Sequence, residues 1–399
     1  MQWRYRYTVL ALMTAALFGT VTARLAISPL VPDLVSAFGT SNGVIGLVLT
    51  GMWATYAVFQ LPGGVLAGRY GERTLVLAAL AFTGIGSVLL SVSPSLPVFA
   101  AVAVGLGAGA GFYFPAGSGL LTREFRRTGQ ALGFHEAGAS LAGLLAPVAA
   151  AAIAVRFGFR AALLVGVVVV PIFLLVLVLI ESPASRFDDD GPSGRSEPTL
   201  DPRALARLLT NPAIASTVIL AIASAFVWQG VASFFPTFLV DHRGMALGPA
   251  SVAFGGIFAV ATVSLPLVGR LSDVVGRDTA LAGTFVLSAG GLVVALEGPG
   301  PLAPFVGAAI IGAGFGWPAA IQSRFMDHLT PTDRTVGFGL VRTVYLTLGS
   351  TGSAVTGAVA DLAGWRAAIG LLAGLFFVAA AGLVFWRLLG SVSGSSFDS

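Results

Sequence analysis

The chain is a succession of long apolar runs separated by short polar loops. A helix that crosses a bilayer needs about 20 mostly apolar residues, and the pattern contains twelve such runs. They lie near residues 8–30, 43–66, 74–92, 98–121, 130–155 and 161–180, and then near 212–239, 250–268, 279–296, 304–322, 336–360 and 367–388. The pattern therefore predicts an all-α integral membrane protein with twelve transmembrane helices.

The second half of the chain repeats the first. Four landmarks recur in the same order at offsets between 203 and 206 residues: residues 64–73 with 269–278, 109–115 with 312–318, 158–163 with 364–369, and Pro32 with Pro236. A conserved order at nearly constant spacing indicates two homologous units. We therefore expect two six-helix bundles related by pseudo-symmetry.

The polar segments divide the chain into four parts. We expect an N-terminal bundle at 1–180, a cytoplasmic linker at 181–211, a C-terminal bundle at 212–388 and a cytoplasmic tail at 389–399 that is disordered. Asp201 and Pro202 form a good start for a short amphipathic helix in the linker. The linker is otherwise too polar and too rich in Gly and Pro to pack.

Arginines are distributed unequally between the loops on the two sides of the membrane. With a cytoplasmic N-terminus, sixteen arginines fall on the inner side and four on the outer side. Short cytoplasmic loops carry the excess of positive charge in membrane proteins. The distribution predicts a multi-pass protein of the cell membrane with both termini in the cytoplasm.

Composition supports a membrane protein and narrows the function. Of 399 residues, 56% are hydrophobic and only 10% charged, and the mean hydropathy is +0.90. Cysteine is absent, which excludes disulfides and thiolate chemistry. The sequence has no phosphate-binding loop, metal-binding helix or nucleophile elbow, so we expect no enzyme, no cofactor and no metal. The basic residues lie in short loops, so nucleic acid is not an expected partner, and we expect a monomer in the lipid bilayer.

The loop at 269–278, GRLSDVVGRD, carries a resemblance to a known family. With the twelve runs, the two halves and the central linker, it resembles the major facilitator superfamily of secondary transporters. The copy at 64–73 departs from the family pattern, with Gly68 where Asp is usual and Glu72 where Arg is usual. The resemblance implies two bundles that rock about a central site.

The resemblance also implies a gating role for the two loops. In the family the loop is thought to tie the halves together on the cytoplasmic side in the outward-facing state. The implied gating residues here are Gly269, Asp273, Gly276 and Arg277, with Arg69 and Arg73 in the weaker copy. We expect this lock between the halves to be asymmetric, with a strong contact through Asp273 and Arg277 and a weak contact through the copy that carries Gly68. The alternative is that these arginines only fix the topology.

Arg24 is the leading candidate for substrate binding. A charge deep in a membrane segment is costly and is typical of functional sites. Thr20, Arg24 and Ser28 are four residues apart and share one helix face, which is expected to line a cavity. A guanidinium can bind a carboxylate or phosphate through two parallel hydrogen bonds. The alternatives are that Arg24 reaches the outer surface or pairs with Asp33.

Arg24 followed by Pro32 looks like the first helix of organic-anion and organophosphate members of the superfamily. Those members often carry a second basic residue in helix 7, where the repeat places Trp228 in this chain. The difference argues against a doubly charged phosphate as substrate.

Helix 5 supplies the candidates for proton coupling. Glu136 is an acidic residue inside a span, His135 is its neighbour, and Ser140, Gly143 and Pro147 share a stripe with Glu136. Arg342 in helix 11 can face Glu136 across the cavity and form a charge pair with it. The alternative is that Glu136 and His135 lie at the depth of the lipid headgroups.

Further polar and aromatic residues are candidates for the walls of the substrate site. They are Tyr56, Tyr113, Trp228, Gln229, Trp317 and Tyr345. The alternative is that the aromatic residues only pack. The preferred interpretation is a secondary active transporter of a small organic anion, coupled to protons or running as a uniporter. A proton-coupled drug or metabolite exporter and a non-transporting membrane receptor on the same scaffold stay as alternatives.

Overall fold

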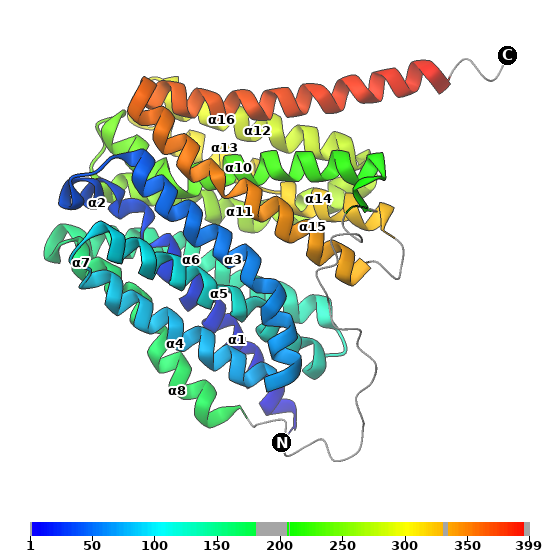
Figure 1. The fold of residues 1–399 in the computed structure, drawn as a ribbon. Helices are drawn as coiled ribbons and strands as arrows, with labels where there is room; N and C mark the ends of the chain where they lie inside the picture. Colours follow the sequence, from blue (N-terminus) through cyan, green and yellow to red (C-terminus); the bar gives the residue numbers. More distant parts are fainter. Residues whose placement is uncertain (1, 181–205, 207, 330–333, 395–399) are drawn as a thin grey trace.

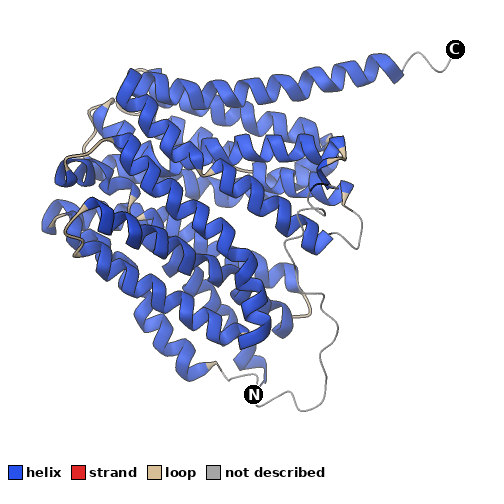
Figure 2. Ribbon diagram, viewed as in Figure 1, coloured by secondary structure: helices blue, strands red, loops and turns tan. Residues whose placement is uncertain are grey.

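The computed structural model describes residues 2–180, 206, 208–329 and 334–394, and these residues form helices joined by short loops, as Figure 2 shows. Most of the predicted amphipathic helix of the linker and the last residues of the tail lie outside the described residues; of the predicted helix, Ala206, Leu208 and Leu209 are described and are helical. Within them, eleven helical segments are long and apolar enough to cross a membrane. The last segment, Gly337–Phe385, is 49 residues long and contains two of the predicted spans.

The first half of the chain forms the lower group of helices in Figure 1. Its elements are α1 (Gln2–Leu25), η1 (Ser28–Leu30), α2 (Val31–Phe38), α3 (Asn42–Tyr70), α4 (Glu72–Ser91), α5 (Leu96–Glu124), α6 (Thr128–Phe157), α7 (Phe159–Leu163), η2 (Leu164–Val168) and α8 (Val169–Leu179).

The second half forms the upper group in Figure 1. Its elements are α10 (Pro212–Asp241), α11 (Leu247–Val275), α12 (Arg277–Glu297), α13 (Ala303–Gly314), α14 (Trp317–His328), α15 (Arg334–Gly349) and α16 (Thr351–Gly394). Helix α16 continues six residues past the end of the predicted last span, so residues 389–394 are helical and not part of a disordered tail. Its interior breaks at Gly364, whose φ of 82° and ψ of 167° are accessible to glycine.

Four predicted spans are interrupted: the sixth by η2, the eleventh at Ser350 between α15 and α16, and also the first and the tenth. The first span contains the end of α1 and a 3₁₀ turn, η1, that begins with Ser28 and Pro29 and leads into α2. The tenth span breaks between α13 and α14 at Phe315 and Gly316, just before Pro318. Proline has no N–H to donate, so a helix tends to restart at it. Broken helices expose free backbone groups near the middle of a membrane bundle.

The two groups of helices pack on each other through a few elements. Helix α3 packs on α15 and α16, helix α6 packs on α11, and η1 packs on α10. The close approach needs glycine, because a Cβ at Gly46 would overlap the backbone of Ser353 and a Cβ at Gly357 would overlap the backbone of Asn42. Small residues allow helix backbones to approach in the absence of a hydrophobic driving force.

Asp361 joins the two groups at the end of the bundle that is opposite the chain termini, which we call the far end. One carboxylate oxygen of Asp361 accepts hydrogen bonds from the Asn42 backbone N–H (3.1 Å) and side chain (3.0 Å), and the other accepts from the Gly43 N–H (2.7 Å). The first N–H groups of a helix have no partner within it. A residue of α16 therefore caps α3 of the other half, and we call this contact the Asp361 clasp.

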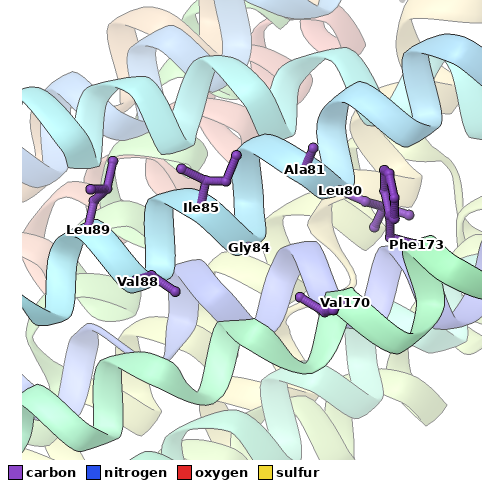
Figure 3. A pocket seen from close by; sticks show the side chains of 8 residues that line it. All are labelled: Leu80, Ala81, Gly84, Ile85, Val88, Leu89, Val170 and Phe173. Carbon is purple, nitrogen blue, oxygen red and sulfur yellow. The ribbon is translucent and has the colours of Figure 1, made fainter.

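The outer surface of the bundle is apolar. Large side chains such as Val178 (77% exposed) and Val378 (71% exposed) are in contact with the surroundings. An open groove of about 330 Å³ lies between α4 and α8, and Figure 3 shows its lining of six α4 residues from Leu80 to Leu89 with Val170 and Phe173 of α8. An apolar surface of this kind can pack against lipid chains, and it has no polar groups that could bind a polar solute.

The Asp361 clasp predicts the effect of removing its carboxylate. Asp361→Ala breaks three hydrogen bonds between the halves, so the far end should open more often, by about 1 kcal/mol or about fivefold in population. Because the chain has no cysteine, opening can be measured as the rate at which a maleimide labels Ser353→Cys, a position that is fully buried.

The matched control is Glu297→Ala, which removes a carboxylate that pairs with Arg366 within one half at 2.8 Å. Labelling should rise in the Asp361 variant and stay at the original rate in the control. Equal rates in all three proteins would show that the clasp does not hold the far end closed.

Candidate functional site

Arg24 lies at the end of α1, just before the first helix break, and its side chain is buried, with 4% exposed. Its Nε donates to the Thr20 carbonyl at 3.2 Å, and its guanidinium carbon lies 4.0 Å from the centre of the Tyr56 ring and 4.8 Å from that of Trp53. The Nη1 atom is buried without a hydrogen-bond partner. Aromatic faces attract a cation, but they do not satisfy its N–H donors.

The structure shows neither of the two alternative arrangements of Arg24. Its burial excludes a path to the outer surface. Among the described residues no carboxylate lies within ion-pair distance of it, Asp33 included. Arg24 is thus a buried charge without a counter-ion, at a helix break in the interior of the bundle.

Helix α3 presents a row of side chains to Arg24 and beyond. Trp53 and Tyr56 are three residues apart and their rings meet edge to face at 5.8 Å. Gln60 follows one turn later, and its amide nitrogen donates to the Tyr56 carbonyl at 3.4 Å. These residues are related by helical spacing, so they share one face of α3.

Arg342 of α15 meets this row from the other half of the chain. Its Nη1 donates to Gln60 Oε1 at 3.0 Å, and its guanidinium carbon lies 4.7 Å from the centre of the Phe114 ring. Tyr345, one turn further along α15, is buried and stacks on Phe325 with ring centres 6.3 Å apart. Tyr56 and Gln60 therefore connect two guanidinium groups from opposite halves.

The predicted charge pair between Glu136 and Arg342 is not formed in this structure. Glu136 lies within the electrostatic range of Arg342, but the two described side chains make no ion pair, and Arg342 binds the neutral Gln60 instead. The stripe that carries Glu136 does face the other half, because a Cβ at Gly143 would overlap the Phe258 ring of α11. The side chain of Glu136 is exposed.

Tyr113 and His135 do not line a cavity with the other candidates but are packed inside the first half. Both are buried, with 1% and 0% exposed. The Tyr113 hydroxyl donates to the Met13 carbonyl and lies 2.9 Å from His135 Nε2. Because that hydroxyl proton is used on Met13, His135 must donate through Nε2–H, which leaves Nδ1 as a buried acceptor without a partner. These residues join α1, α5 and α6.

Two aromatic candidates of the second half, Trp228 and Trp317, lie around the break in the tenth span. Trp228 packs on Phe315 at 4.2 Å and on Phe258 at 5.4 Å between ring centres. Trp317, which is buried, meets Phe315 edge to face at 6.2 Å. Gln229 is buried with its Oε1 unpaired. Trp228 is half-buried and belongs to this cluster, separate from the aromatic residues around Arg24.

The loop of the second half ties helices together within that half. Arg277 pairs with Asp273 and with Asp327 of α14 (3.1 Å), and also donates to the Ser272 hydroxyl at 3.1 Å. Gly276 has a φ of 90°, which allows the sharp turn between α11 and α12. Gly269 is not crowded, since a Cβ there would only just touch Ala319.

The weaker copy of the loop, at residues 64–73, likewise joins helices within the first half. Glu72, which replaces the usual arginine, pairs with Arg123 of α5 at 2.8 Å. Arg73 donates to the Leu177 carbonyl of α8 at 2.7 Å, and the Arg69 guanidinium lies over its neighbour Tyr70. None of the ion pairs recorded for the described residues joins the two halves. The predicted lock between halves is therefore not engaged in this conformation.

Sequence reasoning missed Gln60, Trp53, Phe114 and Asp361. Gln60 is uncharged, so it did not stand out as a membrane charge does, although its spacing from Tyr56 was visible. Asp361 falls in the short loop predicted between the last two spans, 336–360 and 367–388, where a polar residue is ordinary. Among the described residues no group of three His, Cys, Asp or Glu side chains could hold a metal ion.

Comparison with known proteins identifies the family. Residues 12–345 match the family model of the Major Facilitator Superfamily. The chain is 23% identical over 368 residues to the hexuronate transporter of Bacillus subtilis (strain 168), covering 88% of this chain and 87% of the relative. It is 26% identical over 300 residues to the multidrug resistance protein MdtG of Klebsiella pneumoniae (strain 342), covering 72% and 70%.

A solved structure shows the same fold. The crystal structure of a bacterial homolog to the human lysosomal transporter Spinster, described as inward-facing and unoccupied, superimposes with a TM-score of 0.76 at 17% identity, covering 95% of this chain and 96% of that one. The chain belongs to the Major Facilitator Superfamily and is a multi-pass membrane protein of this transporter family.

The buried contact between Tyr113 and His135 predicts a structural role for Tyr113. Tyr113→Phe leaves His135 without a partner in the interior, so the free energy of unfolding should fall by about 1–3 kcal/mol. The measurement is thermal unfolding in detergent, with Tyr70→Phe as the control because Tyr70 is 57% exposed. An unchanged melting temperature in Tyr113→Phe would contradict the role.

Proposed function

We propose that the protein is a secondary active transporter of a small organic anion and that Arg24 is the group that binds the anion. The observation that carries the proposal is the guanidinium of Arg24, which is buried in the bundle with a free Nη1 and, among the residues that the structure describes, without a carboxylate in ion-pair distance. An unpaired charge inside a membrane protein is costly and is retained where function requires it.

The chemistry of the Arg24 environment favours a carboxylate. A guanidinium binds a planar acid group through two parallel hydrogen bonds, and the Nη1 atom is available for one of them. Trp53 and Tyr56 lie against the face of the guanidinium and Nε is bonded to the Thr20 carbonyl, so Nη1 is the atom left for a ligand. A relative that matches nearly the whole chain is a hexuronate transporter, and a hexuronate is a sugar acid.

Transport in this proposal follows alternating access, with the two groups of helices rocking about the Arg24 region. The contacts at the far end, including the Asp361 clasp, belong to one of the two states. The loops at 64–73 and 269–278 act as gating elements that exchange their partners within one half for partners in the other. We further infer a cell-membrane protein with both termini in the cytoplasm.

A second candidate function is export of drugs or other lipophilic compounds. The aromatic cluster of Trp228, Phe258 and Phe315 favours it, as does the likeness to a multidrug resistance protein. This function requires no ligand contact with Arg24, so the same binding experiment separates the two.

The proposal predicts which ligands bind to the purified protein in detergent. Glucuronate, succinate and inorganic phosphate should be tested beside the cation tetraphenylphosphonium by isothermal titration. We expect the carboxylates to bind and Arg24→Gln to weaken them about tenfold or more, because a charged hydrogen bond contributes about 1.5–3 kcal/mol. Arg366→Gln is the control, since Arg366 is largely exposed at the far end.

Binding of tetraphenylphosphonium alone, or equal carboxylate affinity in the wild type and Arg24→Gln, would overturn the organic-anion proposal in favour of export.

Proton coupling through Glu136 predicts a pH effect on uptake. In proteoliposomes, an inward proton gradient should accelerate the uptake of labelled glucuronate by the wild type. Glu136→Gln cannot take up the proton, so its uptake should not respond to the gradient although exchange of glucuronate continues. Glu297→Gln is the control. A wild type that ignores the gradient would indicate uniport, and a response retained in Glu136→Gln would exclude Glu136 as the coupling group.

A further inference from the structure

Arg342 is a second arginine at the interface between the halves, and its bonded partner is neutral. Gln60 Oε1 accepts from Nη1 at 3.0 Å, and the Phe114 ring lies under the guanidinium at 4.7 Å. The ion pairs of the described residues do not include Arg342. The Tyr345 hydroxyl, which is also neutral, interacts with Arg342 as well. A guanidinium carries five N–H donors, and these two oxygens satisfy only part of them. Arg342 is also only half-buried, so part of its side chain is open to the surroundings.

Arg342 and Arg24 contact the same face of α3. Arg24 lies over the Tyr56 ring at 4.0 Å, and Arg342 binds Gln60, which follows one turn later. Four residues of α helix span about 6 Å. The two guanidinium groups thus sit at neighbouring positions along one face, one held by α1 and the other by α15.

We propose that Arg342 is a second anion-binding group. In this structure the side-chain oxygen of Gln60 accepts the hydrogen bond that a substrate oxygen would accept from Arg342. The substrates then carry two anionic groups a few bonds apart. The inference rests on the proposed function of Arg24 as the first anion-binding group.

Charge balance supports a dianion over a monoanion. Arg24 and Arg342 bring two positive charges, and Glu136, which lies within electrostatic range of Arg342, offsets one of them unless it carries the coupling proton proposed above. A dianion therefore balances the site when Glu136 is protonated. A monoanion on Arg24 leaves Arg342 with its neutral partner, whereas a dianion neutralises both guanidinium groups. Charges that leave water are stabilised when they are paired and hydrogen-bonded.

The geometry also links binding to movement of the halves. Arg24 belongs to the first half and Arg342 to the second, so a dianion that binds both groups bridges the interface. The hydrogen bond from Arg342 to Gln60 must break when the second acid group arrives. Exchange of one acceptor for another at Arg342 makes the contact between α3 and α15 dependent on the ligand.

The test compares acids with one and two carboxylates on the full-length protein in detergent. Isothermal titration is performed with malonate, succinate, glutarate and adipate, and with monocarboxylates of the same chain lengths. We expect at least one dicarboxylate to bind about tenfold tighter than its matched monocarboxylate. Arg342→Gln should remove this preference by weakening dicarboxylate binding much more than monocarboxylate binding, and Gln60→Ala should strengthen dicarboxylate binding because Arg342 loses a neutral partner.

Controls keep the outcomes distinct. Arg366→Gln should behave as the wild type, and Arg342→Lys, which keeps the charge without the planar fork, should retain part of the preference if Arg342→Gln does not fold. Carboxylate binding that depends on Arg24 but shows no preference for dicarboxylates, or an Arg342→Gln variant that weakens both classes equally, would overturn the inference and leave the proposed function in place. Absence of any carboxylate binding would overturn both.

Discussion

The arrangement of the interior depends on one electrostatic constraint, the placement of a guanidinium where water cannot solvate it. Arg24 is buried at the break between α1 and η1, and two aromatic faces and one carbonyl group compensate part of its lost hydration. Its Nη1 atom has no hydrogen-bond partner. Because Tyr56 belongs to the helix that also meets Arg342, the position of this single charge is connected to the interface between the halves.

The backbone imposes a second constraint. A membrane helix satisfies its own N–H and C=O groups except at its ends and breaks. In this structure, side chains of other helices form hydrogen bonds with the backbone groups at several of those ends. Asp361 serves the start of α3, Arg243 binds three carbonyl groups around Leu296 and Gly300, and Thr50 bonds the backbone at Ser350 and Ala354. The contacts between the halves therefore depend on hydrogen bonds and on close packing at glycine. Such contacts can be broken and formed with new partners more easily than the contacts of an apolar core.

Hydrophobic pattern alone located the membrane segments, and the repeat indicated the symmetry of the chain. Helix breaks could not be predicted in the same way, since an interrupted and a continuous helix have the same composition. The two copies of one motif illustrate this: Pro115 stays inside the continuous α5, whereas the equivalent segment breaks at Phe315 and Gly316. Arg24 was visible as a charge in an apolar run. Its partners were not, because pairs such as Arg342 with Gln60 are 282 residues apart and only packing brings them together.

The most direct test of the central claim is an experimental structure of the protein with succinate or glucuronate bound. The claim predicts a carboxylate at hydrogen-bond distance, about 3 Å, from the Arg24 guanidinium, with Trp53 and Tyr56 still against its face. A bound acid that lies elsewhere in the bundle, with Arg24 unchanged and its Nη1 still without a partner, would contradict the claim.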